Sequence, residues 1–259
     1  MNGHFFEKAL IGALLASMST ASAVDFVGNA ASIELRTDGG KTLPLYPLSQ
    51  SGVKIKSYAE ALKGEKYKIV IHNRLNRRIG VVLAVDGRNI ISGKKSWLKP
   101  NEGMYVQEPF QTCEYEGWRT SMEQVNRFYF TQAEDSYAAA FKDESAMGVI
   151  AAAIYPEVIR QKEIRKLSGA PSANSRGESE KSSRSASAEA RAGTGYGPEA
   201  YSPVTYVSFE AEQTAVETIF LKYEWRSTLV KLGVVPAEIP VVIKNRFWDM
   251  EFAPPPPKS

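Results

Sequence analysis

Apolar and polar residues alternate along the first half of the chain with the period of two that is typical of half-buried β-strands. The clearest cases are residues 67–72 and 79–85. The second segment ends in Asp86-Gly87, and such a dipeptide tolerates the positive φ angles of a tight hairpin turn. The pattern therefore predicts that residues 89–92 return antiparallel to 79–85.

Shorter strands are predicted between Gly, Pro and Asn punctuation at the spacing of an antiparallel sandwich. They cover residues 31–36, 103–106, 111–115, 127–131 and 148–155. The sequence Thr120-Ser121-Met122-Glu123 has the order of a helix capping box, which favours one or two helical turns through Val125.

The pattern breaks after Pro156. Residues 168–192 are rich in Ser, Arg, Lys and Glu and poor in large apolar side chains, so we expect a disordered low-complexity loop. Alternation resumes at 205–209 and 219–223, and 224–232 fits a short amphipathic helix that ends before Gly233 and Pro236.

These elements predict a mainly β protein, an antiparallel β-sandwich or partly open barrel with a short C-terminal helix and a long disordered loop. Residues 24–167 would form the first part of one domain. Residues 193–250 would complete it, because two strands and a helix are too little for a core of their own. A Pro-rich tail, 251–259, follows. The expected core is Ile69, Ile71, Val81, Leu83, Val85, Phe128, Phe130, Ile219 and Leu221.

The first 23 residues are ordered like a secretory signal peptide. A start that carries Lys8 precedes the apolar run 9–16, and small residues lead to Ala23. We expect cleavage between Ala23 and Val24, and hence an exported protein of the periplasm or the extracellular space. The apolar run is shorter than the ~20 residues of a membrane-spanning helix, so no integral membrane segment is expected after signal removal.

Composition narrows the function classes further. The formal net charge is +3 and both signs are mixed along the chain. The densest basic stretch, 73–78, fits a solvated loop between strands, so no nucleic-acid partner is expected. The single cysteine, Cys113, excludes an internal disulfide. It is either a buried core residue or a thiol that pairs with another chain.

The sequence lacks the usual catalytic and metal-binding motifs. After removal of the signal one histidine remains, His72, and its position on a predicted strand favours a structural, hydrogen-bonded role. One His and one Cys cannot supply a usual zinc site, so no metal and no cofactor are expected. The segment Gly193–Gly197 lacks the Gly-Lys-Ser/Thr ending of a nucleotide-binding loop. We therefore assign no catalytic residue.

Two sets of residues remain as candidate sites. Glu114 and Glu116 share one face of a predicted strand and would serve a hydrolase that uses paired carboxylates. Several aromatic and basic side chains could instead form a platform for a sugar ring or an apolar peptide. These candidate binding residues are Arg88, Trp97, Trp118, Arg119 and Tyr129.

Four segments, 78–93, 117–131, 193–197 and 223–226, resemble an uncharacterised family of exported bacterial proteins. The resemblance covers residues 65–250 apart from the low-complexity stretch. It implies that both halves belong to one unit. It brings no established activity, so no functional residue is carried over from it.

The leading functional hypothesis is a non-enzymatic binding or interaction module of the periplasm or cell envelope, with an envelope protein or a glycan as its ligand. Export, the exposed edges expected of such a sheet and the Pro-rich tail favour it. The alternatives are a carboxylate-dependent hydrolase that acts on an envelope polymer, through Glu114 or Glu116, and a structural envelope component.

Overall fold

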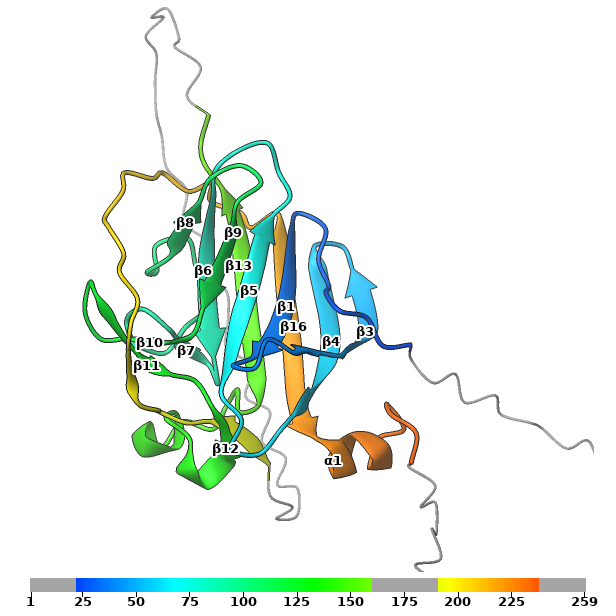
Figure 1. Ribbon diagram of the computed structural model, residues 1–259. Coiled ribbons are helices and arrows are strands. Elements are labelled where there is room, and N and C mark those ends of the chain that lie inside the picture. The colour runs from blue at the N-terminus through cyan, green and yellow to red at the C-terminus, as the bar shows by residue number, and fades with distance from the viewer. Residues whose placement is uncertain (1–21, 160–190, 238–259) are drawn as a thin grey trace, which may run out of the picture.

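Two β-sheets share one hydrophobic core in the computed structural model, which describes residues 22–159 and 191–237 (Figure 1). The sheets are open and mostly antiparallel, so the predicted mainly β fold with one short C-terminal helix is confirmed. The core packs inward-facing side chains of both sheets together, among them Ile33 and Ile69 from one and Leu83 and Leu221 from the other.

The larger sheet is seven-stranded, and its order along the main path is β3-β4-β16-β13-β6-β7, with β8 also paired to β6. Among the described strands of this sheet, β4 and β16 pair in parallel and the other pairs are antiparallel. The strands are β3 (Leu45–Ser51), β4 (Lys54–Ala61), β6 (Ile79–Val85), β7 (Arg88–Asn89), β8 (Tyr105–Gln107), β13 (Val149–Pro156) and β16 (Glu217–Trp225).

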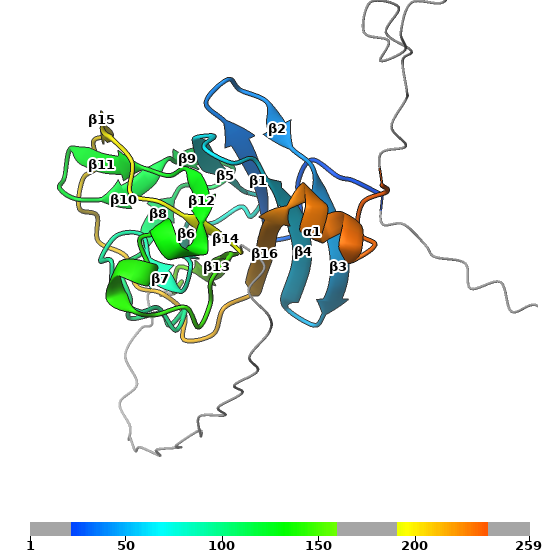
Figure 2. The same ribbon diagram turned by 90° about the horizontal axis from the view of Figure 1, so that it is seen from below.

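The second sheet has the order β2-β1-β5-β9 and two smaller sheets extend it on one side (Figure 2). Its strands are β1 (Ala31–Thr37), β2 (Thr42–Leu43), β5 (Tyr67–Asn73) and β9 (Thr112–Tyr115). The smaller sheets contain β10 (Gly117–Arg119), β11 (Gln124–Arg127) and β15 (Glu199–Tyr201), and β12 (Phe130–Gln132) with β14 (Ala192–Thr194). The helices are the short η1 (Ala133–Asp135), η2 (Ala139–Phe141) and α1 (Arg226–Lys231).

The predicted hairpin after β6 is present. Asp86 and Gly87 have φ angles of 48° and 77°, and Val85 pairs with Arg88 across the turn. Such angles match the right-handed twist of the flanking strands. The returning strand β7 is two residues long, shorter than predicted. All nine predicted core residues are buried.

Three local predictions were wrong. Residues 120–123 form no helical turn but a tight connection in which Thr120 N–H donates to Gln124 C=O at 3.1 Å, and β10 and β11 pair across it. The strand predicted at 127–131 is divided between β11 and β12. Residues 205–209 alternate in sequence but join no sheet. In each case pairing partners decided the outcome over local pattern.

Strands β3 and β4 were not predicted. The inward residues of β4 include Ser57, Ala59 and Ala61, which are buried. Because these side chains are small and one is polar, the strand lacks the apolar alternation that marks a half-buried strand.

Strand β16 lies between β4 and β13 in the larger sheet. At its start the Glu217 carboxylate accepts hydrogen bonds from the backbone N–H groups of Asn29, Ala30 and Ala31, at 2.9 to 3.2 Å. The C-terminal segment is thereby fixed to the beginning of β1 as well as to its sheet neighbours.

Several predicted features fall outside the described residues: the signal peptide up to residue 21, most of the low-complexity loop, and the Pro-rich tail. One residue assigned to that loop is described. Ala192 is buried and pairs with Gln132, so it belongs to β14.

Candidate functional site

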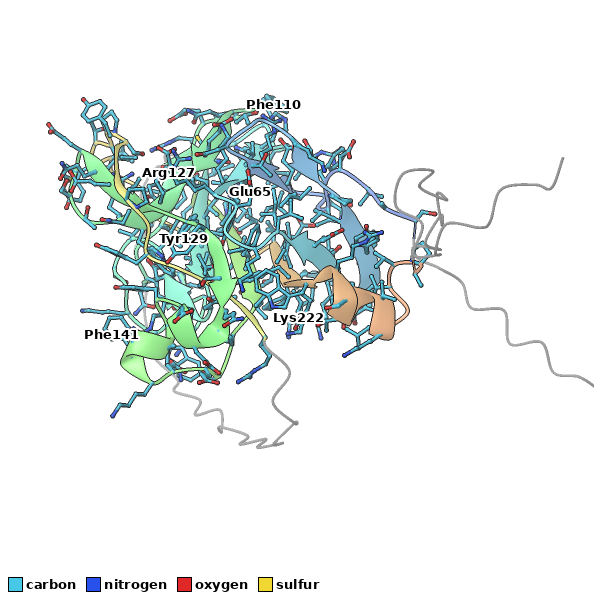
Figure 3. All side chains as sticks on the ribbon, turned by 60° about the horizontal axis from the view of Figure 1, so that its bottom comes forward. Glu65, Phe110, Arg127, Tyr129, Phe141 and Lys222 are labelled. Carbon is cyan, nitrogen blue, oxygen red and sulfur yellow. The ribbon has the colours of Figure 1, made fainter. Side chains whose placement is uncertain are left out.

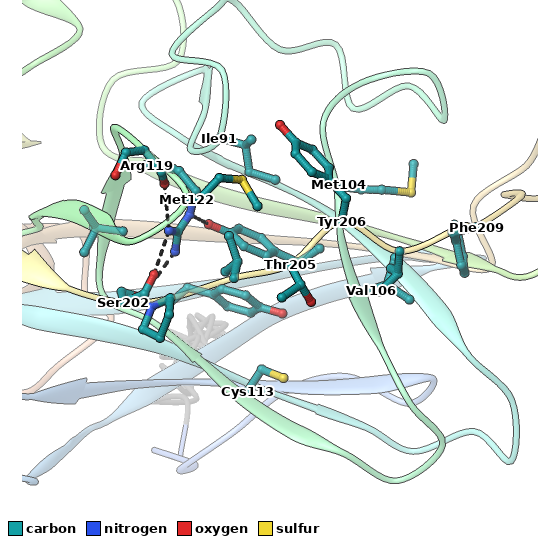
Figure 4. A pocket seen from close by; sticks show the side chains of 18 of the residues that line it. Ile91, Met104, Val106, Cys113, Arg119, Met122, Ser202, Thr205, Tyr206 and Phe209 are labelled. Atoms are coloured by element: carbon teal, nitrogen blue, oxygen red, sulfur yellow. Dashed lines mark hydrogen bonds between the residues drawn. The ribbon is translucent and has the colours of Figure 1, made fainter.

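A pocket of about 880 Å³ opens between the edges of β8 and β9 (Figure 4). One wall contains residues 104–106 and the other residues 113–117, so each wall is formed by consecutive residues of one strand and its flanks. Residues 119–122 close one end, and the segment 202–211 crosses the pocket.

Arg119 fixes the geometry of the pocket mouth. Its Nε donates to the Tyr105 hydroxyl at 2.8 Å, and one Nη donates to the Ser202 carbonyl at 2.7 Å. The guanidinium thus ties β10 to the start of the crossing segment and to β8. Since its donors already serve these oxygens, Arg119 acts as a positioning residue.

The crossing segment, residues 202–211, is extended and is held at its two ends (Figure 4). At one end the N–H groups of Ser202 and Val204 donate to the β10–β11 connection. At the other end Val158 N–H donates to Glu210 C=O at 2.8 Å. Between them Tyr206 is 91% exposed although it lines the pocket. An exposed aromatic ring at a pocket mouth is a feature of binding sites.

Three carboxylates from the described part of the chain line the pocket, and each has partners. Glu114 accepts from Lys68 at 2.5 Å, and Glu116 lies 3.5 Å from Arg127. Glu102 accepts hydrogen bonds from Ser96 and from the N–H groups of Trp97 and Lys99. These contacts fix the positions of the carboxylates in the wall, and the basic partners Lys68 and Arg127 offset part of the charge of Glu114 and Glu116.

Cys113 lies in the same wall as a free, partly buried thiol. Burial raises the pKa of this thiol, while hydrogen bonds from Tyr115 and Gln107 oppose the rise. A raised pKa keeps the sulfur protonated and lowers its reactivity as a nucleophile. The residue is therefore a soft, weakly polar part of the pocket surface.

The five candidate binding residues do not form one platform. Only Arg119 lines the pocket. Trp118 is 2% exposed and packs in the core against Phe128, with its indole N–H donating to Gly195 C=O. Its expected place on a surface platform was wrong, because its strand turns this side chain inward. Trp97 is 69% exposed, with the Lys95 ammonium 5.4 Å from its ring centroid.

Arg88 and Tyr129 lie outside the pocket, and each packs against other residues. Arg88 donates to Gly93 C=O and stacks over the Phe141 ring at 3.8 Å from its centroid. Tyr129 packs against Gly195, leaving no room there for a side chain. The absence of a side chain at Gly195 thus lets the Tyr129 ring pack closely against the backbone. In Figure 3 Tyr129 lies between Phe141 and Phe110, which are on different sides of the molecule in that view.

A buried polar cluster lies on the core side of the β6–β7 turn. The Asp86 carboxylate accepts hydrogen bonds from the Tyr223 hydroxyl at 2.5 Å and from the Thr194 and Gly148 N–H groups at 2.8 Å. Burial raises the pKa of Asp86 to about 6, against the lowering effect of these donors. The cluster joins the turn to β14, β16 and the start of β13, and has a structural function.

Within the described ranges, no group of three or more His, Cys, Asp or Glu side chains could hold a metal ion. His72 makes a hydrogen bond of 2.9 Å with the Thr112 hydroxyl, in accord with its predicted structural role. The same ranges contain no helix that is long and apolar enough to span a membrane.

The main pocket residues that sequence reasoning missed are Tyr105, Tyr206 and Phe209. The alternation over 205–209 was visible, but it indicated a paired strand and not a segment that crosses a pocket. Tyr105 gave no signal, because its role depends on contact with Arg119 fourteen residues later.

Comparison with known proteins gives no relative from which a function could be transferred: no protein-family model, no curated protein and no solved structure matches this chain significantly.

Proposed function

We propose that this protein is a non-enzymatic binding module of the periplasm or cell envelope, and that its ligand occupies the pocket between β8 and β9. The observation that carries the proposal is the pocket itself, a hollow of about 880 Å³ lined by both aromatic and polar side chains. Binding sites combine such an apolar lining with a few placed polar groups.

The contacts of the charged pocket residues favour binding over catalysis. Its arginine is engaged in holding the crossing segment, and its carboxylates have fixed partners in the wall. The predicted signal peptide supports the assignment to the periplasm or envelope. An envelope protein or a glycan remains the proposed class of ligand.

The test compares two exposed tyrosines. Tyr206 lines the pocket and Tyr201, which is 72% exposed on β15, does not. Binding of a heptapeptide library and of soluble peptidoglycan fragments would be measured on the wild-type chain and on Tyr206→Ala and Tyr201→Ala. We expect a bound probe to weaken about tenfold or more with Tyr206→Ala and to be unaffected by Tyr201→Ala. If neither probe set binds, or if the two variants behave alike, the proposal is wrong.

A carboxylate-dependent hydrolase is the second candidate, because Glu114 and Glu116 line the same pocket. Two carboxyl groups on opposite sides of a scissile bond would be needed. Glu114→Gln and Glu116→Gln would each abolish release of reducing ends from an envelope polysaccharide if this candidate were right. The binding proposal expects no release by the wild-type chain.

A structural envelope component, the third candidate, requires self-association. Light scattering on the purified chain tests it, and a monomer at high protein concentration would exclude it.

A further inference from the structure

We infer that the occupant of this pocket is an extended peptide segment of a partner protein, which pairs through its backbone with the free edge of β9. This inference rests on the proposed function, since it names the ligand class of the same pocket. It predicts recognition by main-chain hydrogen bonds, the mode in which a peptide adds a strand to an exposed sheet edge.

The pairing of β9 with β5 shows which backbone groups are free. Asn73 N–H donates to Gln111 C=O at 2.9 Å, which marks this pair as hydrogen-bonded. In an antiparallel ladder every second pair has this property. Glu114, opposite Val70, falls between such pairs. Its N–H and C=O therefore point away from β5, and Glu114 lines the pocket.

The opposite wall, formed by β8, also has backbone groups that point away from its own sheet. Glu157 N–H donates to Arg78 C=O at 3.0 Å, so alternate residues of β6, including Gly80, bond toward β13. Val106 lies opposite Gly80 on β8. Its backbone polar groups therefore point away from β6, and Val106 also lines the pocket.

The lining pattern confirms that the pocket meets strand edges and not a sheet face. A face exposes alternate residues of a strand, whereas here the consecutive residues 104–106 and 113–117 line the two walls. The unpaired backbone edge of a sheet is a template for an added strand.

The protein's own segment 202–211 shows that an extended chain fits across this hollow. It contacts the β10–β11 connection and the end of β13, and it is paired with neither β8 nor β9. Phe209 packs beside Gly80, where an added Cβ would lie 2.7 Å from its ring. Among the described residues no strand pairs with this edge of β9, and apolar side chains such as Met104 and Val106 line the opposite wall. These walls suit a peptide with apolar side chains at alternate positions.

Proline at position 114 tests the inference directly. Proline removes the outward N–H of an edge strand without breaking a ladder bond, so Glu114→Pro blocks the added strand and leaves β5–β9 pairing intact. Thr112→Pro is the matched control, because Thr112 also falls between hydrogen-bonded pairs but does not line the pocket. Glu114→Gln removes the charge and keeps the N–H, so it is the reference against which the loss of the N–H is measured.

The probe is a heptapeptide selected from a random display library on the full chain, and its affinity would be measured by calorimetry. We expect Glu114→Pro to weaken binding about tenfold or more relative to Glu114→Gln, and Thr112→Pro to stay within about twofold of the wild-type chain. Should Glu114→Pro fail to fold, as judged by circular dichroism, N-methylation of single amides in the peptide gives the same test on the wild-type chain. One N-methyl position should then abolish binding.

The possible results separate this inference from the proposed function. Peptide binding that neither Glu114→Pro nor N-methylation weakens would overturn strand addition. Binding of peptidoglycan fragments that depends on Tyr206, with no peptide bound, would overturn the peptide assignment and leave the pocket proposal standing. Failure of peptides and fragments alike would overturn both.

Discussion

At the scale of single residues, Asp86 makes the stability of the fold depend on pH. Its pKa is raised to about 6 by burial, against an ordinary value of 3.8. The folded protein therefore binds a proton more tightly than the unfolded chain. Such a group stabilises the fold most below about pH 4, and this contribution is lost as the pH rises through 6.

We expect the free energy of unfolding to fall by roughly 2 kcal/mol between pH 4 and pH 7 through this group. Denaturant titrations at several pH values would measure it, with Asp86→Asn as the comparison. The variant is expected to be less stable at every pH, because its amide nitrogen would face groups that donate hydrogen bonds to the Asp86 carboxylate. Its stability should also depend less on pH, because the amide does not titrate. Parallel profiles for the two proteins would contradict this assignment.

Phe110 has a backbone conformation that suits glycine. Gln111 N–H donates to Glu108 C=O at 3.1 Å, so Pro109 and Phe110 are the central residues of a turn. Phe110 has φ 59° and is 56% exposed. Proline followed by a residue of positive φ is the pattern of a type II turn, which favours glycine at the second position.

Replacing Phe110 with glycine should therefore raise the free energy of unfolding by roughly 1 kcal/mol, since the left-handed conformation is unfavourable for a residue with a Cβ. Phe26 is similarly exposed, at 52%, and has no positive φ. Phe26→Gly is thus the control and should give no gain in chemical denaturation. Equal losses in both variants would show that backbone strain at 110 is negligible.

At the scale of elements, the Gly-rich segment 193–197 depends on the absence of side chains. An added Cβ at Gly195 would lie 2.5 Å from the Tyr129 hydroxyl oxygen. The same residue accepts the Trp118 indole hydrogen bond at 3.2 Å. The segment therefore packs closely against the rings of Tyr129 and Trp118, and its role is structural.

We expect Gly195→Ala to lower the free energy of unfolding by about 1 to 3 kcal/mol through overpacking. At Gly39 an added Cβ meets its nearest neighbour, the Thr37 hydroxyl oxygen, at 3.8 Å. Gly39→Ala should accordingly be nearly neutral when both variants are unfolded by heat. A neutral Gly195→Ala would mean that Tyr129 can move aside without cost.

Elements also differ in how far their own sequence specifies them. The β6–β7 hairpin is local: alternation sets the face of 79–85, and Asp86-Gly87 sets the turn. Strand β4 has small buried residues and is a strand because β3 and β16 pair with it. The alternation at 205–209 is as clear as that of a strand, but these residues pair with none of the described strands.

At the scale of the whole molecule, the two described parts of the chain form one core. Strand β16 contributes Ile219, Leu221 and Tyr223 to it and lies between two strands from the first part. The last residues of the described chain pack differently, with Leu229 and Val235 against Tyr46. The first part by itself would expose the inner strand edges of β4 and β13.

A chain that ends at residue 190 should therefore fail to unfold cooperatively, as calorimetry would show, because the larger sheet loses a central strand. A chain that ends at residue 250 lacks only the Pro-rich tail and is the control. It should keep a melting transition close to that of the full chain. A sharp transition for the shorter protein would show that the first part folds alone.

The sequence by itself determined the fold class, the hairpin, most strands and the nine core residues. A period of two and a turn dipeptide depend only on residues that are neighbours in the chain, so they can be recognised without the tertiary structure. It also determined that no common catalytic motif is present. The tertiary structure alone decided that β4 and β16 pair in parallel, that Trp118 is buried, and that Arg119, Tyr105 and residues 202–211 form one pocket. These features bring together segments that lie far apart in the chain. Such contacts depend on which strands pair, and pairing is settled by the burial of the whole core and not by the residues on either side.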